Sequence, residues 1–169
     1  QGVKCVGLEA ASHLITNYAE WGFQASSQTI RWQLFNPDEE NRAQAVLNQQ
    51  DFTAVTGPEI PLEAIKKYDS EREFTARPHF LSQWLEHQSG KVIALIDKYN
   101  NCHGFARIRP CLLPAGEGWR IGPILADSPM LAEVLILNLL VEHKGVILID
   151  SPKPNSSAQS LLSSLGFRE

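Results

Sequence analysis

The dipeptide Gly122-Pro123 interrupts an apolar run, 119–125, that otherwise reads as a β-strand. Proline has no N–H group, so a strand that contains it loses pairing with a neighbour on one side. Backbone groups that lack a strand partner can pair with an amide-containing ligand, as in strand addition. The alternative is a bulge or an edge strand that binds nothing. This run is the first candidate for a binding site.

A second candidate is Ala126-Asp127-Ser128, which directly precedes a predicted helix. The free N–H groups and the dipole of a helix start favour an anion such as phosphate. The alternative is that Asp127 and Ser128 simply cap the helix themselves. The Asp127 carboxylate would also repel a phosphate.

Other residues that often do chemistry form no recognised motif. The five histidines lack metal-ligand spacing, and the chain contains no P-loop, GxSxG or GxGxxG sequence. We therefore predict no metal site. Cys5, Cys102 and Cys111 form no CxxC pair and are odd in number, which predicts reduced thiols in a cytoplasmic protein.

Charge and length exclude further classes. The 169 residues carry 15 basic and 19 acidic side chains, a formal charge of −4, which argues against nucleic-acid and acidic-membrane partners because both need a basic face. No apolar run reaches the roughly 18 residues that a bilayer span requires. The missing initiator methionine and the end at Glu169 suggest a piece of a longer protein.

The last third of the chain predicts the elements that hold both candidates. A strand over 119–125, a helix over 129–143 and a strand over 146–150 predict two parallel strands joined by a right-handed crossover. Ser128 is the expected cap of that helix and Pro129 its first residue.

Asn155 is expected to cap a further helix, which presents Ala158, Leu161 and Leu162 on one face. Gly166 supplies the left-handed stop of this helix, and Phe167 is expected to pack back against it.

The middle of the chain adds shorter elements. Strands are predicted over 52–56, 91–97 and 102–109, with a turn at 98–101 that indicates a hairpin. Two helices are expected over 61–68 and 74–87, and a Pro/Gly loop over 110–118. The whole pattern is an α/β fold with a mixed sheet.

The first residues repeat part of this pattern. A helix over 9–21 ends at Gly22, and a strand follows over 28–35 with Gln28, Ile30, Trp32 and Leu34 facing inward. Polar residues 36–51 are read as a linker with a short surface helix. Residues 14–23 and 158–167 both end a helix with an apolar residue, Gly and Phe, so they are either two ordinary helix stops or two tandem copies of one fold.

The order of elements over about 52–167 resembles the GNAT superfamily of acyl-CoA-dependent N-acetyltransferases. The resemblance rests on the segments 104–107, 121–123 and 146–150, and on Asn155, Ala158, Leu165, Gly166 and Phe167. Tyr68-Asp69 with Phe74, Arg77, Phe80, Leu81 and Trp84 resembles a subgroup that carries two GNAT folds in tandem. On that reading 1–35 is the tail of a first fold, 36–51 is the linker, and 52–169 is a second fold without its final strand.

The resemblance implies acyl transfer from acetyl-CoA to a primary amine, on a small molecule or a peptide, by direct attack and without a metal. It implies splayed central parallel strands, with the pantetheine arm on one of them and the pyrophosphate at the following helix. The implied binding residues are Ile124, Leu125, Ala126, Ser128, Met130, Leu131, Asn155 and Ala158.

Catalytic roles follow from the same resemblance. A backbone N–H on the splayed strand would hold the oxyanion, and Glu117 and Asp150 are candidate bases by position. The usual tyrosine that protonates the leaving thiolate is Leu162 in the second fold, whereas Tyr18 holds that place in the first. The partner would be a first domain within the chain or a second copy in a homodimer.

Two functions therefore stay open: an acetyltransferase, or a non-catalytic GNAT-like module that binds a ligand or partner, or only supports the first fold. Three expectations accompany them. The parallel strands should part near 123–126, Asp127→Gly should tighten any CoA binding by removing a repelled charge, and strand 28–35 should complete a sheet.

Overall fold

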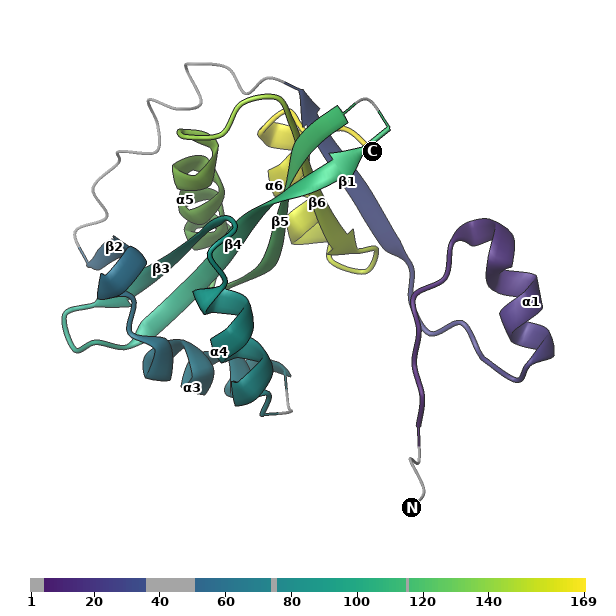
Figure 1. Cartoon of the computed structure of the whole chain (residues 1–169), viewed down its shortest axis with the longest axis horizontal. Coiled ribbons are helices and arrows are strands. Elements are labelled where there is room, and N and C mark those ends of the chain that lie inside the picture. Colours follow the sequence, from purple (N-terminus) through teal and green to yellow (C-terminus); the bar gives the residue numbers. More distant parts are fainter. Residues whose placement is uncertain (1–4, 36–50, 74–75, 115) are drawn as a thin grey trace.

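The computed structural model describes residues 5–35, 51–73, 76–114 and 116–169 (Figure 1). Phe74 and all but the last residue of the predicted linker 36–51 lie outside these residues.

A six-stranded mixed sheet organises the chain, in the order β1-β6-β5-β4-β3-β2. β5 and β6 are parallel and every other neighbouring pair is antiparallel. The predicted α/β fold class is confirmed. The strands are β1 (Thr29–Phe35), β2 (Phe52–Thr56), β3 (Lys91–Asp97), β4 (Cys102–Leu113), β5 (Gly116–Ala126) and β6 (Val146–Pro152).

One face of the sheet packs against α5 (Pro129–Leu140) and α6 (Ser156–Ser164) in a single apolar core. α5 is apolar around most of its circumference, and it contributes six buried residues, because it contacts β3, β4 and β5 of the sheet and also α6. Phe167 packs back into this core after Gly166, whose φ of 85° ends α6 as predicted. None of the described helices is long and apolar enough to cross a membrane.

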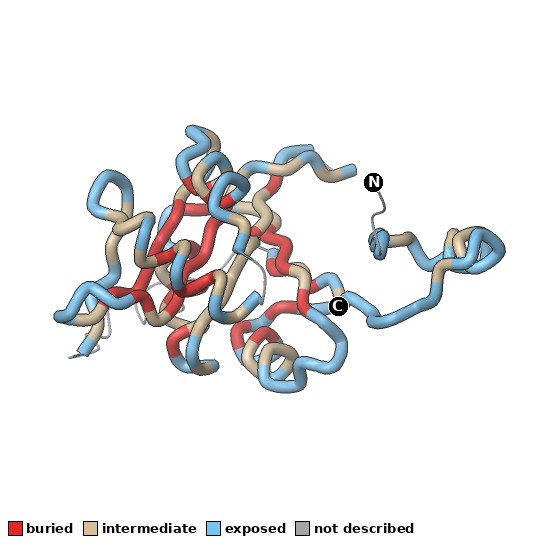
Figure 2. The backbone as a smooth tube through the Cα atoms, turned by 90° about the horizontal axis from the view of Figure 1, so that it is seen from below, coloured by how far each residue is buried: buried red, intermediate tan, exposed pale blue. Residues whose placement is uncertain are grey.

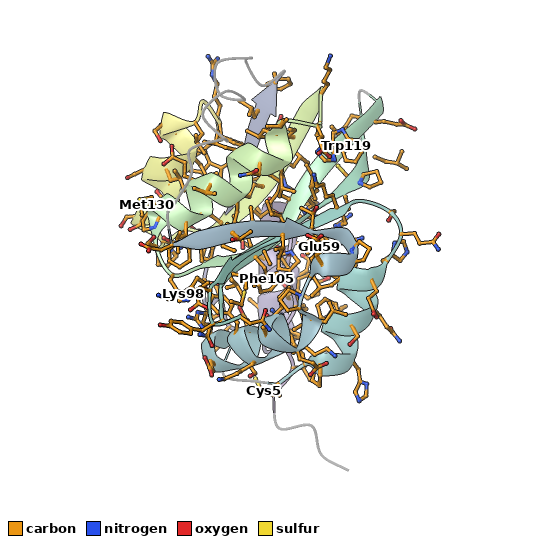
Figure 3. The ribbon with its side chains drawn as sticks, turned by 90° about the vertical axis from the view of Figure 1, so that its left-hand side faces the viewer. Cys5, Glu59, Lys98, Phe105, Trp119 and Met130 are labelled. Atoms are coloured by element: carbon orange, nitrogen blue, oxygen red, sulfur yellow. The ribbon has the colours of Figure 1, made fainter. Side chains whose placement is uncertain are left out.

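Among the described residues, α3 (Leu62–Glu73) and α4 (Pro78–Glu86) cover the opposite face, mainly over β3 and β4. Figure 3 shows Phe105 of β4 between the sheet and these helices. Asp69 of α3 is fully buried and accepts two hydrogen bonds from Arg77, at 2.9 and 2.7 Å, which fastens the start of α4 to α3. A short 3-10 helix, η3 (Gly57–Glu59), follows β2.

The expectation of a loop over 110–118 is wrong. β4 and β5 continue through this segment as a long hairpin, in which Pro110 pairs with Trp119 and Leu112 with Glu117. β3 begins at Lys91, which pairs with Ile108, so among the described strands β4 beyond Ile108 has a partner on one side only, and proline is tolerated on such an edge.

The N-terminal segment stands apart from the sheet until β1 begins. η1 (Ser12–Leu14) and α1 (Ile15–Glu20) form a shorter helix than predicted, and α1 lies well away from the sheet (Figure 1). Figure 2 shows this segment exposed along its length. β1 pairs with β6 of the same chain over its whole length, with Trp32 and Leu34 buried, which confirms the prediction that it completes a sheet.

Candidate functional site

The two parallel strands part in the middle of the sheet. β5 and β6 pair only from Trp119 with Ile147 to Ile121 with Ile149. Beyond that point β5 stays on β4 as far as Ala126, while β6 stays on β1 as far as Pro152. The predicted splay is confirmed, and we call the opening between the two strands the fork.

A bulge in β5 starts the fork. Ile108 of β4 pairs with Ile121 and Ala106 pairs with Ile124, so Gly122 and Pro123 together stand opposite one β4 residue. Such a bulge re-aims the backbone, and Pro123 offers no N–H group to either neighbouring strand. The sequence signal at Gly122-Pro123 therefore marks the place where pairing with β6 stops.

Backbone alternation shows which groups face the fork. The Asp127 N–H donates to the His103 carbonyl on β4 at 3.0 Å. Along a strand, successive N–H groups point to opposite sides, so the polar backbone groups of Ile124 and Ala126 face the fork while those of Leu125 face β4. On the β6 side the same alternation turns the backbone of Asp150 toward the fork, because Lys153 N–H donates to Gln28 on the β1 side.

The start of α5 closes one end of the fork. Ser128 caps the helix, accepting a hydrogen bond from the Leu131 N–H at 3.3 Å, as predicted. The Leu131 side chain is buried in the core, whereas Met130 is 57% exposed. Figure 3 shows Met130 on the same side of the molecule as Lys98, and Trp119 at the other end of the sheet. The Ser128 cap thus occupies the N–H group of Leu131, one of the residues that the resemblance assigned to the cofactor.

Asp127 lies in a hydrogen-bonded network that the sequence did not reveal. Its carboxylate accepts from Tyr68 at 2.9 Å and from Arg72, both on α3, and lies 2.9 Å from His103 Nδ1. The other nitrogen of His103 lies 3.2 Å from Asp97. Partial burial acts to raise the pKa of Asp127, but the hydrogen bonds from Arg72, Tyr68 and His103 hold it below its usual value. The negative charge of Asp127 at the start of α5 is thereby paired with the positive charge of Arg72.

Asp150 is the first β6 residue beyond the paired region. Arg31 of β1 donates to both of its oxygens, at 2.9 and 3.0 Å, and Arg120 of β5 donates to one of them. Burial acts to raise the pKa of Asp150, but the two arginines hold it below its usual value. Asp150 is thus close to the fork, but it is a weaker base than an ordinary carboxylate.

Asn155 and Ala158 lie just after β6. The Asn155 side chain accepts from the Ala158 N–H at 3.0 Å and so caps α6, as predicted. A cavity of about 320 Å³ lies nearby, lined by Ala25–Gln28, Lys153 and Pro154. It lies at the end of β6 rather than between β5 and β6.

Two residues predicted as catalytic lie away from the fork, Tyr18 as a residue of the first fold and Glu117 as a residue of the second. Tyr18 is on α1, where its ring contacts Trp21 and Phe23 edge-on, far from the sheet (Figure 1). Glu117 pairs with Leu112 in the outer part of the β4–β5 hairpin, seven residues before Ile124, a separation of about 23 Å along a strand. Glu117 is a candidate base only by its position in the sequence, and the extended hairpin carries it away from the fork.

Comparisons with known proteins bear on this arrangement. The family model described as an acetyltransferase (GNAT) domain matches residues 65–169. A search of curated protein sequences gives no match. A solved Drosophila protein is similar at 14% identity and a TM-score of 0.58, over 94% of this chain and 55% of its own.

A GCN5-related N-acetyltransferase from Kribbella flavida is similar at 12% identity and a TM-score of 0.56, over 86% of this chain and 36% of its own. An aminoglycoside N-acetyltransferase solved in complex with CoA is similar at 12% identity and a TM-score of 0.52, over 87% of this chain and 92% of its own.

These identities show a shared fold. The chain spans less than two thirds of the length of the first structures that it matches, at 64, 36 and 55%. The family match extends over more than half of the chain and includes the fork, both of its strands and the start of α5. The chain belongs to the acetyltransferase (GNAT) domain family.

Proposed function

We propose that this chain binds acetyl-CoA in the fork and transfers the acetyl group to a primary amine of a small molecule or peptide. The observation that carries the proposal is the end of pairing between β5 and β6 at Ile121 and Ile149. The polar backbone groups of Ile124 and Ala126 beyond that point face an opening between two parallel strands. An extended chain of amides, such as the pantetheine arm, can pair with them as an added strand does.

The start of α5 suits the phosphate end of the same ligand. Ser128 and Met130 lie where the helix dipole is positive, and Met130 is exposed. Arg72 offsets the negative charge of Asp127, which would otherwise oppose a phosphate there. Asp127→Gly removes that charge and releases Arg72, so we still expect this substitution to tighten CoA binding. Leu125, Leu131, Asn155 and Ala158 line the proposed path as packing and capping residues.

The reaction forms a C–N bond between the amine and the acetyl carbon and breaks the C–S bond of the thioester. The amine gives up one proton, and the departing thiolate takes one up. Because its pKa is held low, Asp150 orients the amine by accepting a hydrogen bond rather than by storing its proton at neutral pH. The amine proton leaves to solvent water, and solvent water supplies the proton that the departing thiolate takes up.

A non-catalytic GNAT-like module is the second candidate. Leu162, at the place of the usual proton-donating tyrosine, is buried in the core and carries no acidic hydrogen. Asp150 is a weak base, and Tyr18 and Glu117 lie away from the fork. A chain with these features could bind acetyl-CoA without turning it over.

Titration calorimetry with acetyl-CoA on the purified chain separates these functions, together with a thiol-release assay on a mixture of amines. We expect binding, and thiol release that depends on added amine. Binding without release would favour the non-catalytic module, and a folded chain that binds no acetyl-CoA would refute the acetyltransferase.

A matched pair of variants tests the fork itself. Ala126→Pro removes an N–H group that faces the fork and leaves pairing with β4 intact, so acetyl-CoA binding should weaken about fivefold or more. Ala126→Ser keeps the N–H group and should bind as the wild-type chain does. Equal affinities for two folded variants would place the ligand elsewhere.

A further inference from the structure

Four charged side chains lie in a row across the sheet face opposite α5 and α6. Their chain neighbours Ile108, Ile121, Ile149 and Trp32 point into the core beneath those helices. Successive side chains of a strand point to opposite faces. Arg109 of β4, Arg120 of β5, Asp150 of β6 and Arg31 of β1 therefore share the other face, which α3 and α4 cover mainly over β3 and β4. We call these four residues the basic row.

The strand register makes this row unusual. Arg109 and Arg120 stand directly opposite one another, as do Arg31 and Asp150. Asp150 already binds both Arg31 and Arg120, and Glu9 adds an attraction to Arg31. Arg109 stacks over Trp84 at 5.3 Å and has no acidic partner among the residues that the structure describes.

Like charges in directly opposite positions destabilise a sheet. The basic row has three guanidinium groups and one carboxylate, and the buried Arg107 adds a further positive charge beside Arg109. The chain as a whole is acidic, with a formal charge of −4, so this local excess does not follow from composition. The same pair of arginines becomes favourable when an anion lies between them, since guanidinium groups bind carboxylate and phosphate in a two-pronged geometry.

The row lies at the mouth of the fork. Arg120 comes one residue before the last β5 residue that pairs with β6, and Asp150 comes one residue after the last paired residue of β6. A ligand that binds the basic row from this face is only a few residues, counted along β5 and β6, from the place where a thioester in the fork would react.

From this arrangement we infer that the basic row binds the anionic group of the acceptor, an amine that carries a carboxylate or a phosphate a few bonds from its nitrogen. This inference rests on the proposed function for the identity of the reaction. Arg109 and Arg120 hold the anion, and Asp150 fixes Arg31 and Arg120 in place.

Three amines with the same two-carbon spacing test this inference: β-alanine with a carboxylate, O-phosphoethanolamine with a phosphate, and ethanolamine with a neutral hydroxyl. We expect kcat/KM for at least one of the two anionic amines to exceed that for ethanolamine by about 10- to 100-fold, the worth of a hydrogen bond between charged groups. The anionic amine with the larger kcat/KM shows whether the site takes a carboxylate or a phosphate. Equal values for all three would overturn the inference.

Arg109→Gln is the critical variant, because Arg109 has no acidic partner whose loss would complicate the result. It should reduce the preference for the anionic amine about tenfold or more. Because it removes a repulsion, it should melt at the same temperature as the wild-type chain or higher. A lower melting temperature would show that Arg109 serves the stacking with Trp84, against the inference. Lys98→Gln removes the same charge from the β3–β4 turn and should leave the preference unchanged.

Binding without acetyl-CoA separates this inference from the proposed function. The rise in melting temperature with each amine is measured on the chain alone, and acetyl-CoA binding is measured by calorimetry on the same preparation. Stabilisation by an anionic amine that Arg109→Gln abolishes, in a chain that binds no acetyl-CoA, would support the anion site and refute the acetyltransferase. Acetyl-CoA binding with no preference among the amines would support the acetyltransferase and refute the anion site.

Discussion

At the scale of single residues, charged side chains fasten the elements around the fork. Asp69 and Arg77 join α3 to α4, Asp127 joins α3 to the start of α5, and Asp150 joins β1 to β5. Each carboxylate has an arginine from another element as its partner. The network thus fixes the helices and strands on both sides of the opening.

Arg77→Ala should destabilise the chain by about 3 kcal/mol, because it leaves the fully buried Asp69 carboxylate without its partner. The free energy of unfolding in urea measures the effect. Glu73→Ala is the matched control, since Glu73 lies 3.9 Å from Arg77 on the surface and should change stability by less than about 0.5 kcal/mol. A loss for Arg77→Ala no larger than the control's would contradict this role for the buried pair.

The low pKa of Asp127 gives a pH dependence with a defined sign. A carboxylate whose pKa is lower in the folded state stabilises that state above its unfolded pKa, and this contribution disappears as the pH falls through the folded value. Asp127→Asn should therefore cost about 1 kcal/mol at pH 7, and the difference from the wild-type chain should shrink as the pH falls through the lowered pKa of Asp127 in the folded chain. Urea unfolding across this range measures it, and a difference independent of pH would show that the charge of Asp127 does not matter.

The sequence predicts the contacts that form between residues close together in the chain. Ser128, Asn155 and Gly166 were assigned correctly because a helix cap depends on residues within one turn. Tyr68 and Arg72 lie one helical turn apart, which could have suggested a shared face of α3. Their partner Asp127 is more than fifty residues away, and no local pattern indicates such a contact.

At the scale of elements, the pairing of the strands explains which features of the sheet the sequence predicts and which it does not. The alternation in β1 and the break at Gly122-Pro123 are visible in the sequence because side-chain period and proline chemistry are local. The long β4–β5 hairpin was missed because Pro110 and two glycines in that segment resemble a loop. That proline is acceptable in a strand because β3 begins opposite Ile108 and does not reach Pro110.

Amide exchange in β1 should alternate from residue to residue. Gln33 donates to Arg168 on the outer side of β1, so the N–H groups of Ile30, Trp32 and Leu34 point toward β6. These three should exchange slowly, whereas Arg31 and Phe35 should exchange fast, and Gln33 should lie between them. NMR hydrogen–deuterium exchange measures each site, and fast exchange at all three inward amides would mean that β1 is unpaired.

At the scale of the whole molecule, the N-terminal residues divide into two parts with different roles. None of residues 5–28 is buried, and α1 contributes no buried side chain. Trp21, the large apolar residue that follows α1, is 76% exposed. β1 is the edge strand of the sheet next to β6 and supplies Trp32 and Leu34 to the core. The origin of 1–35 in a first fold stays a prediction, but β1 is physically part of the sheet that holds the fork.

Two truncations test this division. A chain that begins at Gln28 keeps β1 and should unfold with nearly the free energy of the full chain, because none of the described residues that it loses, 5–27, is buried. A chain that begins at Asn36 loses Trp32 and Leu34 from the core and bares the edge of β6, so it should lose more than about 5 kcal/mol, the upper cost of deleting one large core side chain. Urea unfolding compares the three chains. If the chain from Asn36 kept the stability of the chain from Gln28, β1 would be dispensable, and the fork would need only the strands from β2 to β6.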